Sequence, residues 1–184
     1  MQNLAQLRAI IAADPARMRI LRRVKELGLA DCWVAAGFVR SAVWDHLHLR
    51  GSSPLPPDID VIWFNGELAN EEMDVEIEAA LRRSGDTLNW SVKNQARMHL
   101  RNHDQAYTSA LDAMTHWPET ATAVAVRLGA NDVIEVAAPF GLDDLFNMIV
   151  RPTARFQVEK RHAYLDRLHA KNWLRTWPRL KILG

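Results

Sequence analysis

Residues 32–64 constrain the fold of this chain more than any other segment. CWVAA (residues 32–36) has the composition of a short buried strand, Gly37 follows directly, and FVRSAVWDHLH then has the length and apolar spacing of a helix. Three prolines in the next loop exclude regular pairing there. DIDVIWF, which begins at Asp58, has the β-branched and aromatic content of a central strand. The segment therefore predicts a strand, a helix and a second strand at one sheet.

The rest of the chain also mixes the two periodicities. The patterns predict further helices near residues 4–11, 15–27, 69–83 and 108–116, and strands at 90–101, 120–128 and 133–139. The last two strands are joined by Gly129-Ala130-Asn131-Asp132, which is typical of a hairpin. Ser84-Gly85 is predicted to end the helix at 69–83. We therefore predict an α+β fold, a mixed β-sheet flanked by helices, formed by residues 1–184 as a single domain.

Composition excludes several classes of protein. The chain has 184 residues, which fits one domain, and its single cysteine, Cys32, excludes an intrachain disulfide framework and a cysteine-based zinc cluster. No apolar run approaches the ~20 residues of a membrane span. Charged residues interrupt the apolar N-terminal stretch, so it lacks a signal-peptide core. We expect a cytoplasmic protein without a membrane partner.

Charge is distributed unevenly along the chain. Residues 151–184 contain nine Lys or Arg and two acidic residues, whereas residues 1–150 are net acidic. Such asymmetry can mark a tail that binds nucleic acid, or a basic helix that lies on an acidic body. Apolar anchors such as Tyr164, Trp173 and Trp177 favour the second interpretation. We therefore expect residues 151–184 to form a basic helical segment packed on the domain.

The candidate chemistry lies around Asp58-Ile59-Asp60. Alternation places Asp58 and Asp60 on one strand face, about 7 Å apart, where they repel each other unless a cation is near. Hard divalent ions such as Mg²⁺ take oxygen ligands and leave places for substrate phosphates. Gly37, between a strand and a helix N-terminus, would let phosphate oxygens approach backbone N–H groups. Taken singly, Asp58 could cap a turn and Gly37 could serve a tight turn, but their order favours a site for a nucleoside triphosphate with Mg²⁺ or Mn²⁺.

AAGFVRSAVWDHLH and DIDVIWF resemble the glycine-helix and Asp-x-Asp motifs of the DNA polymerase beta-like nucleotidyltransferase superfamily. They are most similar to the head domain of tRNA nucleotidyltransferases, in which Gly-Gly-x-Val-Arg-Asp precedes Asp-x-Asp. WSVKNQARMH, WPETATAVAVRL and APFGLDDLF resemble a family of bacterial nucleotidyltransferase-like proteins, over nearly the whole chain. The resemblance implies a nucleotidyltransferase-like fold.

The resemblance also implies roles for individual residues. Asp58 and Asp60 match the metal-binding, catalytic pair, Gly37 matches the first motif glycine, and Arg40 matches the arginine of Val-Arg, so that Gly37 and Arg40 would bind substrate. Phe38 occupies the second glycine or serine position of this substrate site, where its ring could crowd the phosphates. A further departure is Ser41, which replaces the motif aspartate.

Superfamily members usually supply a third catalytic carboxylate from a later strand. Glu135 in VIEVA is the best candidate, although it could equally be an edge-strand residue that faces water. The alternation of WSVKNQARMHLR predicts a strand with one cationic face, formed by Lys93, Arg97, His99 and Arg101. The same residues are also good helix formers. We expect Lys93 and Arg97 to bind substrate and Arg101 to face solvent.

Two functions follow. The first is a metal-dependent nucleotidyltransferase that moves a nucleoside monophosphate from a nucleoside triphosphate to an acceptor, RNA or a small molecule, and releases pyrophosphate. The second is a catalytically inactive module on the same fold that binds nucleotide or nucleic acid. The ring of Phe38 and the absence of an obvious third acid support the second.

Overall fold

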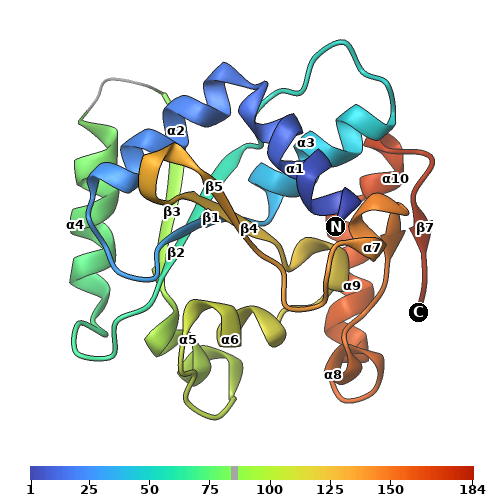
Figure 1. The fold of residues 1–184 in the computed structure, drawn as a ribbon. Coiled ribbons are helices and arrows are strands. Elements are labelled where there is room, and N and C mark those ends of the chain that lie inside the picture. Colours follow the sequence, from blue (N-terminus) through green and yellow to red (C-terminus); the bar gives the residue numbers. More distant parts are fainter. Residues whose placement is uncertain (84–86) are drawn as a thin grey trace.

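A five-stranded mixed sheet lies at the centre of the structure (Figure 1). In sheet order its strands are β3 (Asn89–Asn94), β2 (Asp58–Trp63), β1 (Trp33–Ala35), β4 (Ala125–Leu128) and β5 (Ile134–Ala137). β2 and β3 are parallel, and the other neighbours are antiparallel. This computed structural model describes residues 1–83 and 87–184. Its architecture confirms the predicted α+β fold with a mixed sheet flanked by helices.

The helices and the remaining short elements surround this sheet. The helices are α1 (Gln2–Ala12), α2 (Pro15–Glu26), α3 (Gly37–Leu47), α4 (Glu71–Arg82), α5 (Gln95–Asn102), α6 (Ala110–Thr115), α7 (Asp143–Phe146), α8 (Ala154–Gln157), α9 (Arg161–Lys171) and α10 (Trp173–Thr176). Two 3-10 turns, η1 (Thr120–Thr122) and η2 (Ala130–Asp132), and a small parallel pair, β6 (Ile149–Val150) with β7 (Lys181–Ile182), complete the described part. Within it, no helix has both the length and the apolar character needed to cross a membrane.

Local capping explains where several helices begin and end. The Asp14 carboxylate accepts hydrogen bonds from the amides of Ala16 (2.9 Å) and Arg17 (3.0 Å), which starts α2 as predicted. Asn70 caps α4 by accepting from the Met73 amide at 3.1 Å. Gly28 follows α2 with a φ of +64°, a left-handed conformation that favours glycine. The helix end predicted at Ser84-Gly85 lies outside the described residues.

The two faces of the sheet differ in chemistry. One face buries valine and isoleucine side chains of β1, β2, β3 and β4 beneath the N-terminal helices: Val34, Ile59, Val61, Val92 and Val126. The opposite face has a smaller apolar cluster, in which Ala35, Ile62 and Ala125 pack against Met114 of α6. Strand alternation places the polar residues of β2 and β3 on this second face. A cavity can therefore form there, beside the smaller cluster.

The C-terminal segment lies against the body of the protein, on one side of the sheet (Figure 1). The rings of Trp173 and Trp177 meet the buried Trp44 of α3 edge-on, with centroid distances of 5.8 and 5.2 Å. The Trp177 indole also donates to the Asp45 carboxylate at 2.8 Å. These contacts hold α10 next to α3.

The strand predicted at residues 90–101 is wrong in its second half, because β3 ends at Asn94 and α5 begins at Gln95. Asn94 is fully buried, and its side-chain oxygen accepts from the amide of Ala96 at 3.0 Å, which caps the helix. Its amide group donates to the carbonyls of Asn65 (2.9 Å) and Leu68 (3.0 Å). These long-range bonds fix the boundary, which the alternating sequence does not show.

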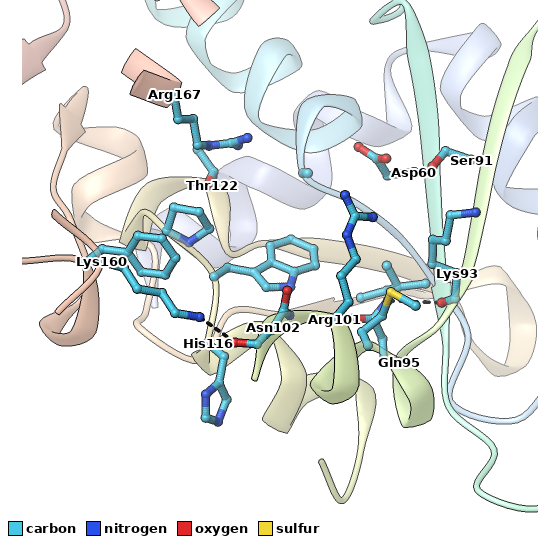
Figure 2. Close-up of a pocket in the computed structure, with 16 residues that line it drawn as sticks. Asp60, Ser91, Lys93, Gln95, Arg101, Asn102, His116, Thr122, Lys160 and Arg167 are labelled. Atoms are coloured by element: carbon cyan, nitrogen blue, oxygen red, sulfur yellow. Dashed lines mark hydrogen bonds between the residues drawn. The ribbon is translucent and has the colours of Figure 1, made fainter. Parts of the chain in front are cut away.

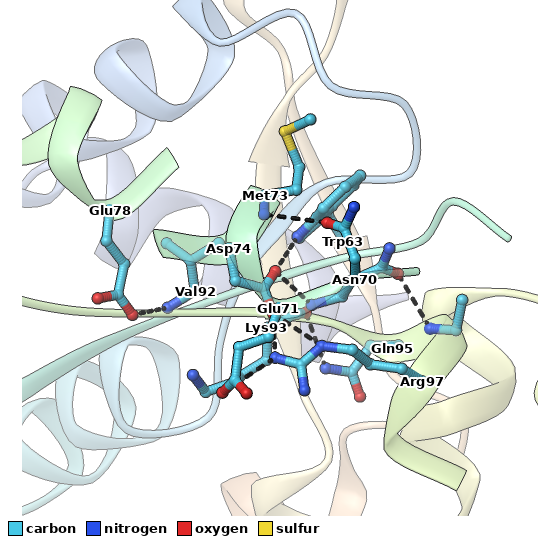
Figure 3. Close-up of polar contacts among 12 residues, drawn as sticks. Trp63, Asn70, Glu71, Met73, Asp74, Glu78, Val92, Lys93, Gln95 and Arg97 are labelled. Carbon is cyan, nitrogen blue, oxygen red and sulfur yellow. Dashed lines mark hydrogen bonds and ion pairs between the residues drawn. The ribbon is translucent and has the colours of Figure 1, made fainter. Parts of the chain in front are cut away.

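Asp74 of α4 joins α4, α5 and the sheet (Figure 3). Its side chain is 1% exposed and accepts from the Trp63 indole and the Asn94 amide, both at 2.8 Å. It also pairs with the guanidinium of Arg97, whose Nε lies 3.1 Å away. Both oxygens of this buried carboxylate therefore have hydrogen-bonding partners, which come from β2, β3 and α5.

We predict that Asp74→Ala lowers the free energy of unfolding by about 3–5 kcal/mol, because it leaves a half-buried arginine and two buried donors without their acceptor. Glu71 is a matched control: it lies on the same helix, is 72% exposed and stays 3.9 Å from Arg97. We expect Glu71→Ala to change stability by no more than about 0.5 kcal/mol. Urea denaturation of both variants measures the difference, and similar losses in the two would contradict the assignment.

Candidate active site

Asp58 and Asp60 lie on the same face of the sheet, as alternation predicts, and this is the face with the smaller apolar cluster. In the register of the sheet, Asp60 is beside Ala35 of β1 and Ser91 of β3. Asp58 is exposed and accepts a hydrogen bond from the Asn89 side chain, whereas Asp60 is partly buried. The two carboxylates are thus neighbours along β2, with one at the surface and one at the wall of a cavity.

The pKa of Asp60 is raised by burial and, next in size, by the negative charge of Asp58. The positive charges of Arg40 and Lys171 and a hydrogen bond from Ser91 oppose this shift without cancelling it. The protein therefore only partly neutralises the negative charge of the acidic pair. Among the described residues, no cluster of three or more His, Cys, Asp or Glu side chains is arranged to hold a metal ion.

The turn between β1 and α3 holds an unusual backbone conformation at Ala36. Its φ of 51° and ψ of −113° belong to a region that favours glycine. The Ala36 amide donates to the Val124 carbonyl at 2.9 Å, and its carbonyl accepts from the amides of Val39 and Arg40. Counted back from Val39-Arg40, the first glycine of Gly-Gly-x-Val-Arg-Asp falls on Ala36 and the second on Gly37. The assignment of Gly37 as the first glycine is therefore wrong by one residue.

Gly37 and Phe38 are both explained by packing at the start of α3. A Cβ atom on Gly37 would lie 3.3 Å from the Cβ of Pro56 and 3.5 Å from Nη2 of Arg40, so glycine makes room for the proline loop and for the guanidinium. The Phe38 side chain is fully buried in the core beneath the Arg17 guanidinium, 5.6 Å from its ring centroid. The expectation that this ring crowds the substrate site is wrong, because it points into the core.

Arg40 is a buried cation next to the acidic pair. Its guanidinium lies over the rings of Trp44 (5.6 Å) and Trp173 (5.0 Å), and its Nε has no hydrogen-bond partner among the described residues. Burial, together with the charge of Arg167, lowers the pKa of Arg40 to about 10, while Glu119 and Asp60 favour its charged form. At neutral pH Arg40 is therefore a cation with unused hydrogen-bonding capacity.

A cavity of about 500 Å³ opens beside Asp60, between the sheet, α5 and the C-terminal segment (Figure 2). This volume is within the usual range of small-molecule sites. Cationic side chains surround it: Lys93, Arg101, Lys160 and Arg167. Asp60 is the one acidic residue among those that line it. The cavity is thus suited to a ligand with several negative charges.

Lys93 lines this cavity, in register beside Ile62, but Arg97 does not. Arg97 is bound to Asp74 on the far side of α5, so the expectation that it meets substrate is not supported by its position. Arg101 is exposed, as expected, and it also extends from α5 toward the end of the cavity that holds Asp60 (Figure 2). The positions of the two arginines differ from the expectation because residues 95–102 form a helix and not a strand.

Glu135 is not brought to the acidic pair. The register runs from Asp60 through Ala35 and Ala125 to Ala137, so that Glu135 lies three strands away and two residues further along β5. Its carboxylate accepts from Arg127 Nε at 2.7 Å, and both side chains are partly exposed. The expected third carboxylate is therefore not supplied by Glu135.

Two cationic residues of the cavity come from the C-terminal segment and were not singled out in the sequence. Lys160 donates to the Asn102 carbonyl at 2.8 Å, and Arg167 donates to the fully buried Glu119 carboxylate at 2.7 Å. Glu119 also accepts from the Thr122 hydroxyl at 2.6 Å. The basic composition of residues 151–184 was the one signal that pointed to them.

We predict that Ala36→Gly raises the free energy of unfolding by about 1 kcal/mol, because glycine adopts this positive-φ conformation without strain. This corresponds to a rise in melting temperature of roughly 2–4 °C. Ala35→Gly, in the adjacent buried strand residue, is the control and should lower stability. Losses of stability in both variants would show that Ala36 is not strained.

We predict that, without divalent ions, Asp60→Asn melts at or above the temperature of the native sequence at pH 7. The pKa of Asp60 is raised in the folded protein, so between its unfolded and its folded pKa the folded protein holds a proton that the unfolded chain has lost. The free energy of unfolding therefore falls as the pH rises through this range. The advantage of the variant should shrink as the pH approaches the ordinary aspartate pKa of about 3.9. Calorimetry across this range tests the sign, and a lower melting temperature for the variant at pH 7 would contradict it.

Comparison with known proteins supports this description of the fold. A family model described as nucleotidyltransferase matches residues 22–182. A protein whose NMR structure is described as revealing a CCA-adding enzyme head domain is 36% identical, with a TM-score of 0.87 over 98% of this chain and 95% of that one. None of the curated proteins matches the chain.

Two CCA-adding enzymes share the fold at lower identity. The complex of one with CTP is 15% identical, with a TM-score of 0.60 over 100% of this chain and 43% of that one. The Thermotoga maritima enzyme complexed with tRNA is 17% identical, with a TM-score of 0.58 over 96% of this chain and 42% of that one. This chain thus spans less than half the length of these enzymes. The match over residues 22–182 and the 36% identical relative show that the chain belongs to the nucleotidyltransferase family.

Proposed function

We propose that this protein catalyses metal-dependent transfer of a nucleoside monophosphate from a nucleoside triphosphate to an acceptor, with release of pyrophosphate. One observation carries the proposal: Asp60, whose negative charge and that of its neighbour Asp58 are only partly neutralised by the protein, lines a cavity whose other charged lining residues are cations. A nucleoside triphosphate with a divalent ion matches both features, since the ion meets the acids and the phosphates meet the cations.

The donor set of the pair fits a hard divalent ion such as Mg²⁺ or Mn²⁺. Two carboxylates would supply oxygen ligands, and a cation would relieve their mutual repulsion, which adds to burial in raising the pKa of Asp60. The small number of protein ligands suits an ion that takes its remaining ligands from water and phosphate. Such an ion, when bound, stabilises the negative charge that develops at the reacting phosphate.

The residues of this chain would orient and neutralise the triphosphate. Lys93, Arg101 and Arg167 line the cavity and offer cationic donors to phosphate oxygens. Arg40 adds a buried positive charge at the start of α3. The first amides of α3 are at the same turn, where a helix N-terminus favours anions. These groups would also compensate the charge of the departing pyrophosphate.

In the reaction, an acceptor hydroxyl oxygen attacks the α-phosphorus and its proton passes to solvent, while the bond from this phosphorus to the bridging oxygen breaks and pyrophosphate carries the electron pair away. An RNA hydroxyl or a small-molecule hydroxyl would serve as acceptor. The CCA-adding enzymes of the same fold, in complexes with CTP and with tRNA, support a nucleoside triphosphate and an RNA acceptor here.

A second candidate function is a module that binds nucleotide without transferring it. The position of Glu135 favours this alternative, because this candidate for the third carboxylate expected from the superfamily does not lie beside the pair. Phe38 no longer supports it, since its ring is buried in the core. The two functions differ in product formation and not in nucleotide binding.

We predict that Asp60→Asn lowers the rate of nucleotide transfer by at least about 100-fold, because it removes one of two ligands of the ion. Glu135→Gln is the matched control and should keep the rate within about twofold, since Glu135 lies across the sheet. Release of pyrophosphate from a panel of nucleoside triphosphates with Mn²⁺ and an RNA acceptor measures both. Full activity of Asp60→Asn would contradict the mechanism, and nucleotide binding without any product would favour the second candidate.

A further inference from the structure

The lining of the cavity beside Asp60 is of two kinds. Its charged residues suit phosphates, but an apolar wall is also present, formed by Ile62, Met98, Trp117, Pro118 and Phe156. Phosphates and a metal ion need no apolar wall. This wall therefore indicates that part of the ligand is flat or apolar.

Trp117 differs from every other tryptophan in the chain. The chain has seven, all within the described residues, and six of them are at most 9% exposed. Trp117 is the one that is partly exposed, and it lines the cavity. Part of its aromatic surface is thus left available where the cavity would receive a ligand.

The backbone around Trp117 is fixed without any ligand. Its amide donates to the Met114 carbonyl at 3.2 Å, and its carbonyl accepts from the Thr153 hydroxyl at 2.8 Å. The Thr153 amide donates to the Pro118 carbonyl at 2.9 Å. The ring packs against the apolar cluster that contains Ala35 and Ile62. A ring held in this way binds a flat partner at little cost in conformational entropy.

Phe156, the other aromatic ring of the wall, is less available. It is 8% exposed, and the Lys160 ammonium lies 5.7 Å from its ring centroid. Its exposed surface is therefore small and already faces a cation. Trp117 is the ring that can offer a face to a ligand.

We propose that Trp117 is the stacking surface for the base of the bound nucleoside triphosphate. This inference rests on the proposed function, because the triphosphate end at Asp60 and Lys93 fixes the other end of the ligand. Every nucleobase has a π-face, so stacking alone binds all four bases. The wall thus provides affinity for the base with little discrimination among bases.

The test compares ligands with and without a base. Trp117→Leu keeps apolar volume and removes the aromatic face, whereas Trp117→Phe keeps a smaller one. Dissociation constants are measured by calorimetry, with Mg²⁺, for ATP, GTP, CTP, UTP and inorganic tripolyphosphate. We expect Trp117→Leu to weaken all four nucleotides by roughly tenfold or more, and tripolyphosphate by less than about twofold. Trp117→Phe should recover most of the nucleotide affinity.

Fluorescence provides a second measurement that a purely structural role would not change. Stacking should quench the fluorescence of Trp117, so nucleotide-dependent quenching is lost in Trp117→Phe. Trp33→Phe is the matched control, because Trp33 is 9% exposed on the same sheet face, lies beneath Arg127 and does not line the cavity. Quenching should persist in this control.

Several outcomes would overturn the inference. Equal nucleotide affinity in Trp117→Leu and the native sequence would exclude stacking, and an equal loss for tripolyphosphate would show a general effect on the cavity. A loss confined to one base, or to an RNA oligonucleotide with nucleotide affinity intact, would assign Trp117 to another role. Failure of the proposed function looks different: the native protein would bind nucleotide through Trp117 and form no product.

Discussion

Compensation of buried charge connects the distant parts of this structure. Asp60 on β2, Arg40 on α3, Glu119 before η1 and Arg167 on α9 influence one another, since the pKa of Arg40 responds to all three partners. A buried charge is costly unless opposite charges or hydrogen bonds accompany it. Arg167 can reach Glu119 only when α9 lies against the body, as the Trp173 and Trp44 contact also requires. The basic C-terminal segment is therefore part of the charge balance of the site.

Much of the fold follows from short-range patterns. The period of two in DIDVIWF correctly places Asp58 and Asp60 on one face of β2, and the Asp14-Pro15 pair correctly starts α2. The end of β3 could not be predicted in this way, because the residues after Asn94 fit both periodicities. Hydrogen bonds from Asn94 to Asn65 and Leu68, nearly thirty residues earlier, decide the boundary. Such bonds depend on the tertiary arrangement and leave no local signal.

Local sequence patterns also do not predict which residues come together at the site. Whether Arg97 or Arg101 reaches the cavity depends on Asp74, which binds Arg97 from another helix. Whether Glu135 meets Asp60 depends on the register of three strand pairs. Sequence spacing identifies residue types that suit phosphate and metal chemistry, but it does not fix these longer-range relations. Trp117 illustrates the point, since seven tryptophans look alike until burial distinguishes one.

The two candidate functions share one physical origin. The repulsion between Asp58 and Asp60 and the burial of Asp60 favour a bound cation whether or not chemistry follows. Under either proposal, metal and nucleotide binding would therefore depend on the local electrostatics of β2 and on the cations of the cavity. Transfer requires in addition that an acceptor oxygen be placed in line with the α-phosphorus. Arg167 of α9 lines the cavity, so the packing of the C-terminal segment sets part of the positive charge that a triphosphate would meet there.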